Sequence, residues 1–315
     1  MTPPSRRDED LTSTSDRAGQ PRPARGRRSK AAWSGLLFAV PALLMYAIFV
    51  LRPMIVSVQY SFYKWNGIGA STWVGFDNYL RVFTDPDLLG PIGNAFKLIV
   101  FFSFVPVVLG LAIAATTRQI AESRLASVAR TVLFLPQVIP LVAAGIIWTW
   151  LLSSTGLVNQ VMDAVGLNSL TRAWLGDFST ALPAVGVIGA WVLLGLCTLL
   201  LLAGISHIDP ALYEAARLDG AGPWREFLSI TLPSLRQEIG VCVTVTVIAA
   251  LASFDIVYIS TQGGPGNSSM VPGLEIYYQA FTERQVGAAS ALGVVLMLLV
   301  LLVVLPIQWV TKERD

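Results

Sequence analysis

Six long runs of apolar residues, almost free of charge, constrain this chain more than any other feature. A membrane-spanning helix needs about 20 predominantly apolar residues to cross the hydrocarbon layer. Lipid offers peptide groups no hydrogen-bond partners, so each run is expected to be helical. The runs lack the period-two alternation of strands, which excludes an eight-stranded membrane barrel. The predicted spans are residues 34–57, 95–117, 131–152, 181–204, 239–261 and 287–310.

Charge is scarce and unevenly placed. The chain is 54% hydrophobic and 13% charged, whereas a soluble domain carries about a quarter charged residues. Residues 1–32 are rich in Pro, Arg, Ser, Thr and Asp, have little to bury, and are expected to form a disordered tail. The following run is longer than a signal-peptide core and lacks a small-x-small cleavage site, which favours a retained span. The sequence predicts an all-α, polytopic membrane protein with one six-helix domain at 33–315.

The distribution of Lys and Arg predicts the orientation, because basic residues favour the cytoplasmic side. The tail, the loops 118–130 and 205–238, and the C-terminus hold most of the 22 basic residues. The tail next to the first span carries most of this bias. We therefore expect both termini and the loop 205–238 to lie in the cytoplasm. The opposite side holds only Arg52, Lys64, Arg81, Lys97, Arg172 and Arg284.

The loop 205–238, between the fourth and fifth spans, has strong helix signals. Asp209 followed by Pro210 is an N-cap with proline at the first helical position. Gly220 is a left-handed helix stop, and Pro223 is expected to open a second short helix ending near Ile230. The pattern predicts a helix–turn–helix outside the bilayer. By itself it also fits a plain, well-capped connecting helix.

A longer pattern in this loop is more specific. Glu214-Ala215-Ala216, then Gly220, then Ile230 and Leu232-Pro233 resemble the EAA motif of ABC importer permeases. In that family the short helix docks on an ATPase subunit and passes its closing motion to the spans. The resemblance implies that Pro233 fixes the start of the fifth span. It implies ATPase-coupling contacts at Glu214, Ala215, Ala216, Asp219 and Gly220.

Other segments are similar to the sugar-type branch of these permeases. They are Leu135–Pro140, Ile147-Trp148, Gly156–Asn159 and Thr261–Asn267. The chain resembles the first permease component of maltose- or glycerol-phosphate-type importers. It lacks the large maltose-type extracytoplasmic insert, which favours the compact members. The resemblance implies a multi-pass protein of a prokaryotic inner (plasma) membrane that moves a sugar, polyol or glycerol-phosphate solute.

The resemblance also implies partners. These are a second permease subunit, two ATP-binding subunits or domains, an extracytoplasmic solute-binding protein and membrane lipid, with no nucleic acid. The chain has no Gly-Lys pair, and a phosphate-binding loop of the Walker type requires one. We therefore expect ATP hydrolysis on a separate polypeptide, with no enzymatic activity and no cofactor on this chain. Cys197 and Cys242 lie in apolar runs without ligand spacing, so neither a disulfide nor a metal site is predicted.

Polar groups within spans are candidates for lining a solute path, because burying them in lipid is costly. Sugars are commonly held by hydroxyl and carboxylate hydrogen bonds beside an aromatic face. The alternative is structural, since Ser often bonds neighbouring helices and Trp and Tyr favour the membrane interface. The candidates are Trp191, Ser253, Asp255 and Tyr258.

Two other functions compete with the importer hypothesis. An ion-coupled secondary carrier would use Asp255 as its titrating group, but internal repeats are not evident and intramembrane acids are few. A membrane enzyme would need a nucleophile–base pair, and with a single histidine no such spacing stands out.

Overall fold

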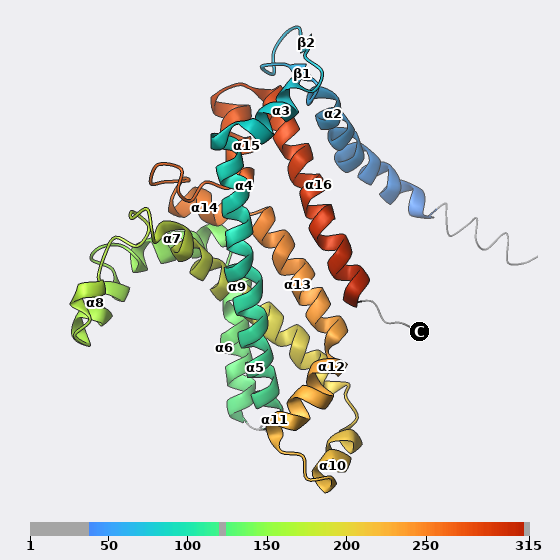
Figure 1. Ribbon diagram of the computed structural model, residues 1–315, viewed down its shortest axis with the longest axis vertical. Coiled ribbons are helices and arrows are strands. Elements are labelled where there is room, and N and C mark those ends of the chain that lie inside the picture. Colours follow the sequence, from blue (N-terminus) through green and yellow to red (C-terminus); the bar gives the residue numbers. More distant parts are fainter. Residues whose placement is uncertain (1–37, 120–123, 312–315) are drawn as a thin grey trace, which may run out of the picture. The chain divides into compact units, whose positions relative to one another are not determined.

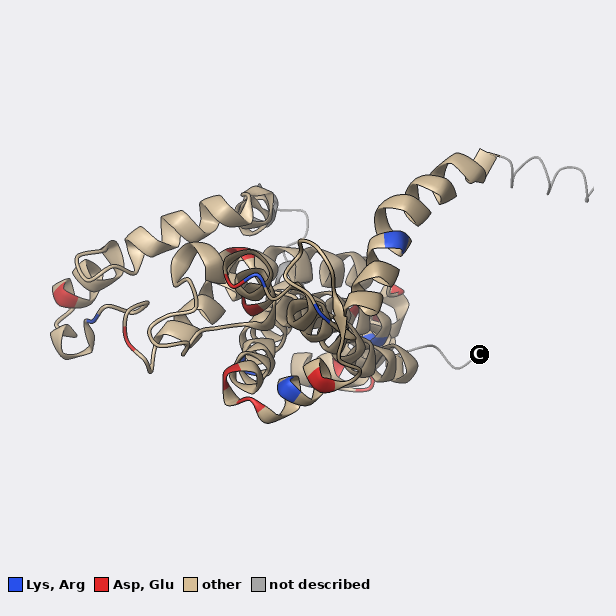
Figure 2. Ribbon diagram, turned by 90° about the horizontal axis from the view of Figure 1, so that it is seen from above, with Lys and Arg blue, Asp and Glu red and all other residues tan. Residues whose placement is uncertain are grey.

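The computed structural model describes residues 38–119 and 124–311. The predicted tail at 1–32 and the C-terminal Lys312 and Arg314 lie outside these residues. The chain comprises two compact units, Met1–Pro53 and Met54–Asp315. Helices dominate the described residues, and the only strands among them form one two-stranded hairpin. Figure 2 shows that most of the ribbon carries neither Lys, Arg, Asp nor Glu.

The long apolar helices confirm the prediction of an all-α polytopic membrane protein. Four described helices are long and apolar enough to cross a bilayer, and two bent helix pairs raise the number to six. The second span begins nine residues earlier than expected, because Asp85 caps a helix that opens at Pro86. The four are Phe38–Tyr60 (with η1, Ala47–Leu51, and α2, Arg52–Tyr60), Pro86–Thr116 (α4, Pro86–Ile99; η2, Val100–Phe104; α5, Val105–Gln119), α9 (Ala181–Ser206) and α16 (Val286–Thr311).

The third span is not one straight helix. The pair α6 (Arg124–Val138) and α7 (Leu141–Leu151) is bent by 106° at Ile139–Pro140. Pro140 is extended and stands at the N-cap of α7. Proline has no N–H to continue the ladder of α6, and its ring disfavours a helical residue before it. The span expected at 131–152 therefore corresponds to this sharply bent pair of helices.

The fifth span is also broken, and the continuous helix expected at 239–261 was wrong. Helix α13 runs from Arg236 to Leu251, and the short helix α14 (Asp255–Ser260) follows after three residues. On its other side, α13 meets the helical segment Pro223–Ser234 at 68°. The stretch 239–261 is predominantly apolar despite Ser253 and Asp255, so its mean hydropathy does not reveal the break after α13.

Three of the four π-helical segments in the described chain end two residues before a proline. In each case the carbonyl four residues before the proline lies in the middle of the π turn. A proline ring clashes with that carbonyl in an α-helix, and the wider π turn moves the carbonyl aside. The pairs are η1 with Pro53, η2 with Pro106, and η4 (Phe227–Thr231) with Pro233; the fourth segment is η5 (Tyr278–Thr282).

Within the unit Met54–Asp315, α9 is the central helix and packs against α5 and α6 (Figure 1). Its residues Val185, Ile188 and Leu201 are completely buried. Helix α13 packs against α4 and α16. Many large apolar side chains on the outer faces of these helices remain exposed, as expected for surfaces that meet lipid or another subunit.

Two groups of loops and short helices lie at opposite ends of this unit, and the segment that contains α8 (Leu157–Ala164) projects from its side (Figure 1). One end carries the hairpin, in which Tyr63 pairs with Trp73 and Lys64 with Thr72. The other end carries α10. The first end includes β1 (Tyr63–Lys64), β2 (Thr72–Trp73), α3 (Asp77–Thr84) and α15 (Pro272–Tyr277). The second end includes α10 (Pro210–Leu218), α11 (Pro223–Glu226) and α12 (Leu232–Ser234).

Candidate functional site

Helix α10 is a short helix with both ends fixed by side-chain and backbone caps. At its start, the Asp209 carboxylate accepts a hydrogen bond from the N–H of Ala211, and Pro210 occupies the first position. At its end, Gly220 has a φ of +78°. The N–H of Gly220 bonds the carbonyl of Arg217, and the N–H of Ala221 bonds that of Ala216. This pair of bonds is the Schellman motif, and it confirms the predicted stop.

The residues of the EAA pattern face outward on this helix. Glu214, Ala215, Asp219 and Gly220 are exposed, and Ala216 is half-buried. Their coupling role remains a prediction. A Cβ added to Gly220 would meet no atom of the described residues within 4 Å, so the C-terminal end of α10 is open at this point.

The same loop exposes large apolar side chains. Leu218 is 90% exposed and Trp224 is 72% exposed. The Trp224 ring stacks on Phe227 with centroids 5.6 Å apart, which holds it in place. Exposed apolar side chains outside a span are typical of a surface that meets a partner. Sequence reasoning did not identify either residue, although both stand within the EAA pattern.

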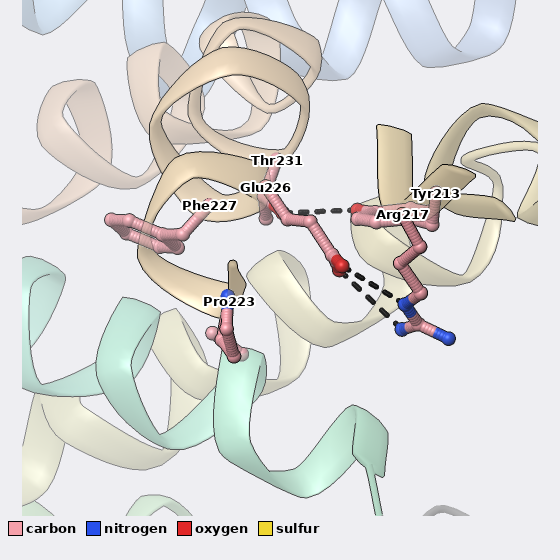
Figure 3. Close-up of a pocket in the computed structure, with 7 residues that line it drawn as sticks. Tyr213, Arg217, Pro223, Glu226, Phe227 and Thr231 are labelled. Atoms are coloured by element: carbon pink, nitrogen blue, oxygen red, sulfur yellow. Dashed lines mark hydrogen bonds and ion pairs between the residues drawn. The ribbon is translucent and has the colours of Figure 1, made fainter. Parts of the chain in front are cut away.

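Two side-chain interactions join α10 to the helical segment that begins at Pro223 (Figure 3). Arg217 Nε lies 2.9 Å from Glu226 Oε1, and Nη2 lies 3.4 Å from Oε2. The Tyr213 and Thr231 hydroxyls are 3.0 Å apart. Together with Ala115, Pro223 and Phe227, these four residues line a cavity of about 170 Å³. None of the four was among the predicted site residues, because their partners lie 9 and 18 positions away in the sequence.

The ion pair joins an exposed group to a covered one. The Arg217 side chain is 62% exposed, whereas that of Glu226 is 10% exposed. The hydrogen bond to Glu226, together with the attraction of its charge, raises the pKa of Arg217. A covered carboxylate requires such a partner, because leaving it unpaired costs its desolvation energy. Tyr213 itself is only 2% exposed, so α10 is anchored through its inner face.

Pro233 lies where the loop turns into the fifth span. It follows the π turn η4 in the three-residue helix α12, and the 68° bend to α13 comes just after it. Leu235, at the bend, is completely buried. Tilting the segment Pro223–Ser234 would therefore act directly on the start of α13.

Three of the four predicted path residues lie in or just after the break that follows α13, whereas Trp191 lies on α9. Trp191 packs edge-on against Trp148, with ring centroids 5.6 Å apart. Ser253 is 7% exposed and lies in the break, whereas Asp255 is exposed at the first position of α14. Tyr258 stacks on Phe254 at 5.3 Å.

Sequence reasoning did not include Tyr277 or Tyr278, which lie in this region, among the path candidates. Tyr277 packs against Tyr258 at 5.5 Å and against Tyr278 at 5.8 Å. Within the described chain, Ser253 Oγ, Trp148 Nε1 and Gln137 Oε1 are buried without a hydrogen-bond partner. Buried polar atoms normally have partners, so unpaired ones next to aromatic rings suit a polar ligand.

Comparison with known proteins decides the family. Residues 95–312, which include the loop 209–234 and all four predicted path residues, match the binding-protein-dependent transport system inner membrane component family. The chain belongs to this family.

Individual relatives agree with this membership. The chain is 37% identical to the probable ABC transporter permease protein YurN of Bacillus subtilis, over 84% of this chain and 91% of that protein. It is 35% identical to the diacetylchitobiose uptake system permease protein NgcF of Streptomyces coelicolor, over 90% of this chain and 85% of that protein. A chain in the structure of a bacterial alginate ABC transporter, in complex with an alginate pentasaccharide-bound periplasmic protein, superposes with a TM-score of 0.75 at 25% identity. The match covers 92% of this chain and 99% of that chain.

Proposed function

We propose that this inner-membrane component is one of two permease subunits that form the path for a sugar in a binding-protein-dependent ABC importer. Its relatives include a permease named for diacetylchitobiose uptake and one from an alginate importer, which supports a carbohydrate as the solute. The unpaired Ser253 hydroxyl, the Trp148–Trp191 pair and the tyrosines at 258 and 277 supply hydrogen-bonding and aromatic groups suited to a sugar.

The observation that carries the proposal is the construction of the loop 209–234. Its inner face is fixed by Tyr213 and Glu226, while its outer face exposes Glu214, Leu218 and Trp224. A rigid element with an uncovered surface, continuous with a span, can pass a push from a separate ATPase into the membrane. Binding of ATP by that partner would then shift the spans between outward- and inward-open populations.

The proposed orientation follows from the basic residues. The loop 209–234 and both termini face the cytoplasm, where ATP is available, and the hairpin end faces outward. The solute-binding protein delivers the sugar to that outer end, and ATP hydrolysis belongs to the separate ATPase. We expect this chain to work without a cofactor or metal of its own.

The test is uptake by the complete importer in proteoliposomes, with its ATPase, second permease subunit and solute-binding protein present. The proposal predicts sugar uptake that requires ATP on the side of the loop 209–234, is inhibited by vanadate and ignores an uncoupler. ATP-independent uptake abolished by an uncoupler would instead establish the ion-coupled carrier.

A second test addresses the solute path alone. At wild-type expression, Asp255→Asn and Trp191→Ala are expected to raise the half-saturating sugar concentration or lower the uptake rate. Val241→Ala, on the exposed face of α13, is the control with unchanged uptake. Wild-type rates in both path variants would remove Asp255 and Trp191 from the path and leave the importer function in place.

A further inference from the structure

The hairpin end of the unit Met54–Asp315 contains a pocket of about 510 Å³ that the function proposed above does not use. One wall comes from the hairpin loop and the start of α3, between Lys64 and Arg81. The opposite wall comes from Arg284, Gln285 and Ala288, where α16 begins. None of the predicted path residues lines it.

The two walls are locked together. The N–H of Gly287 donates a hydrogen bond to the carbonyl of Trp65 at 3.2 Å, and a Cβ on Gly287 would overlap the carbonyl oxygen of Tyr63. On the hairpin side, Asn78 Nδ2 donates to the carbonyls of Ser61 and Tyr63 at 2.8 and 3.0 Å. The pocket is therefore formed before any ligand arrives, which lowers the cost of binding.

The charged side chains that line the pocket are mostly cationic. Its lining holds Lys64, Arg81 and Arg284 against the single acid Asp77, and all four are exposed. Within the described ranges none of the three cations forms an ion pair. Arg81 reaches only a neutral group, Gln285 Oε1, at 3.4 Å. The N-terminal end of α16 adds its positive dipole to the same wall.

Arg284 has an unusual backbone. Its φ is +56°, a left-handed conformation that is uncommon for residues other than glycine and costs energy. This conformation closes the end of η5, where the N–H of Gln285 bonds the carbonyl of Gln279 at 2.7 Å, and it fixes the backbone from which the Arg284 side chain enters the pocket lining.

We propose that this cationic pocket receives acidic side chains of the extracytoplasmic solute-binding protein. The inference rests on the proposed function, because it requires that the hairpin end faces outward. Three cations on two rigid walls suit several carboxylates presented together by a folded surface, and complementary charge of this kind steers association and fixes register. The pocket is walled by a loop and a helix end rather than by the flank of a span, which favours a protein over a lipid headgroup.

Charge reversal tests the proposal in the intact importer held in nanodiscs. The probe is the solute-binding protein that supports ATP-driven uptake by the wild-type importer. Lys64→Glu, Arg81→Glu and Arg284→Glu are each expected to raise its Kd on the order of tenfold and to flatten the salt dependence of binding. Arg172→Glu makes the same charge change in another outer loop, where Arg172 lies over the Trp174 ring and outside the pocket. This control is expected to leave Kd within about twofold of wild type.

Conservative variants keep the test decisive if a reversal disturbs folding. Lys64→Gln and Arg81→Gln retain most of the side-chain length and are expected to weaken binding less, in the same direction. Reversing a facing carboxylate on the solute-binding protein to lysine is expected to restore binding to the Glu variants.

Unchanged Kd and salt dependence in all five variants, while the wild-type importer transports sugar, would overturn the cationic pocket but not the importer. Loss of affinity only in nanodiscs with anionic lipid, or only with an anionic sugar loaded, would assign the pocket to lipid or solute and would equally overturn the proposal. If the wild-type importer failed to use ATP for uptake, the proposed function itself would fall.

Discussion

Arg217 Nε lies 2.9 Å from Glu226 Oε1, so one ion pair bridges the turn between α10 and the helical segment Pro223–Ser234. The bridge converts two short helices into one body. Tyr213 and Thr231 make a second, parallel connection at 3.0 Å. The proposed push from an ATPase therefore reaches α13 without being absorbed at the glycine-containing turn 219–222.

Neutralising Glu226 should weaken this transmission. Glu226→Gln keeps the side-chain volume but loses the charge that holds the Arg217 guanidinium. We expect ATP-driven uptake to fall by roughly two- to thirtyfold, the range for residues that carry coupling without touching either ligand. The ratio of sugar molecules imported to ATP hydrolysed, measured in proteoliposomes, should fall as well.

The control is Arg225→Gln, which removes an exposed charge adjacent to Glu226 that forms no ion pair with the residues the structure describes. The exchanged double variant, with Arg217→Glu and Glu226→Arg, should recover part of the ratio. Equal transport ratios in Glu226→Gln and wild type would show that the ion pair does not carry the motion.

The Tyr213–Thr231 connection should contribute to stability. Tyr213→Phe removes the hydroxyl and keeps the buried ring, and we expect a loss of about 0.5–1.5 kcal/mol in the free energy of unfolding. Thr231→Val should have a similar effect. Because both substitutions break the same hydrogen bond, the double variant should lose less than the sum of the two losses. Strict additivity in the unfolding of the purified chain would contradict this contact.

Substitutions at Gly220 should reduce stability because of its backbone conformation and not because of steric crowding. Its φ is +78°, and a Cβ placed on it meets nothing within 4 Å. Gly220→Ala is therefore expected to cost about 1–2 kcal/mol of unfolding free energy, the penalty of the left-handed conformation, and Gly220→Asn less.

The matched control for this prediction is Gly93 in α4. A Cβ there also meets nothing within 4 Å, and the backbone is helical. Gly93→Ala should stabilise the chain by about 0.5–1 kcal/mol, the opposite sign. The two substitutions together separate backbone strain from the addition of a methyl group. A stabilising Gly220→Ala would remove the basis of the helix stop.

Glu275, in α15 outside the spans, should make stability depend on pH. Burial raises the pKa of its carboxyl above 4.5, and the neighbouring Glu283, Asp87 and Asp85 act in the same direction. The hydrogen bond from Gln279 Nε2, at 3.0 Å, opposes this rise. The folded chain thus holds the proton more tightly than the unfolded chain does, and stability falls as pH rises from 4.5 through the folded pKa.

Glu275→Gln removes this penalty while keeping a side chain that can bond Gln279. We expect the variant to unfold at a higher temperature than wild type at pH 8, with the gain shrinking as pH falls and vanishing below 4.5. Asp163→Asn, an exposed change of equal charge, controls for net charge. A gain that stays constant across this pH range would contradict the assigned cause.

Much of the architecture was predictable because it depends on local composition. The six apolar runs located the spans, because a helix must have about 20 apolar residues to cross the hydrocarbon layer of the bilayer. The caps at Asp209 and Gly220 were also predictable, because each acts within four residues of its own position.

The helix breaks and the contacts between residues far apart in the chain were harder to predict from the sequence. The bend at Ile139–Pro140 and the break between α13 and α14 interrupt runs that are predominantly apolar on both sides. Pro140 signals the first, whereas no proline marks the second. The cationic pocket combines residues more than 200 positions apart. Neither wall alone carries enough charged residues for the sequence to predict a cationic site.

The central claim is that the loop 209–234 meets a separate ATPase on the cytoplasmic side, and cross-linking tests it most directly. A photoreactive maleimide is attached to Leu218→Cys, 90% exposed on the loop, or to Ile68→Cys, 72% exposed in the hairpin loop at the opposite end. The native Cys197 and Cys242 are buried. In membranes containing the assembled importer, illumination should link position 218, and not position 68, to the ATPase subunit. Cross-links to the ATPase from position 68, with none from position 218, would contradict the account.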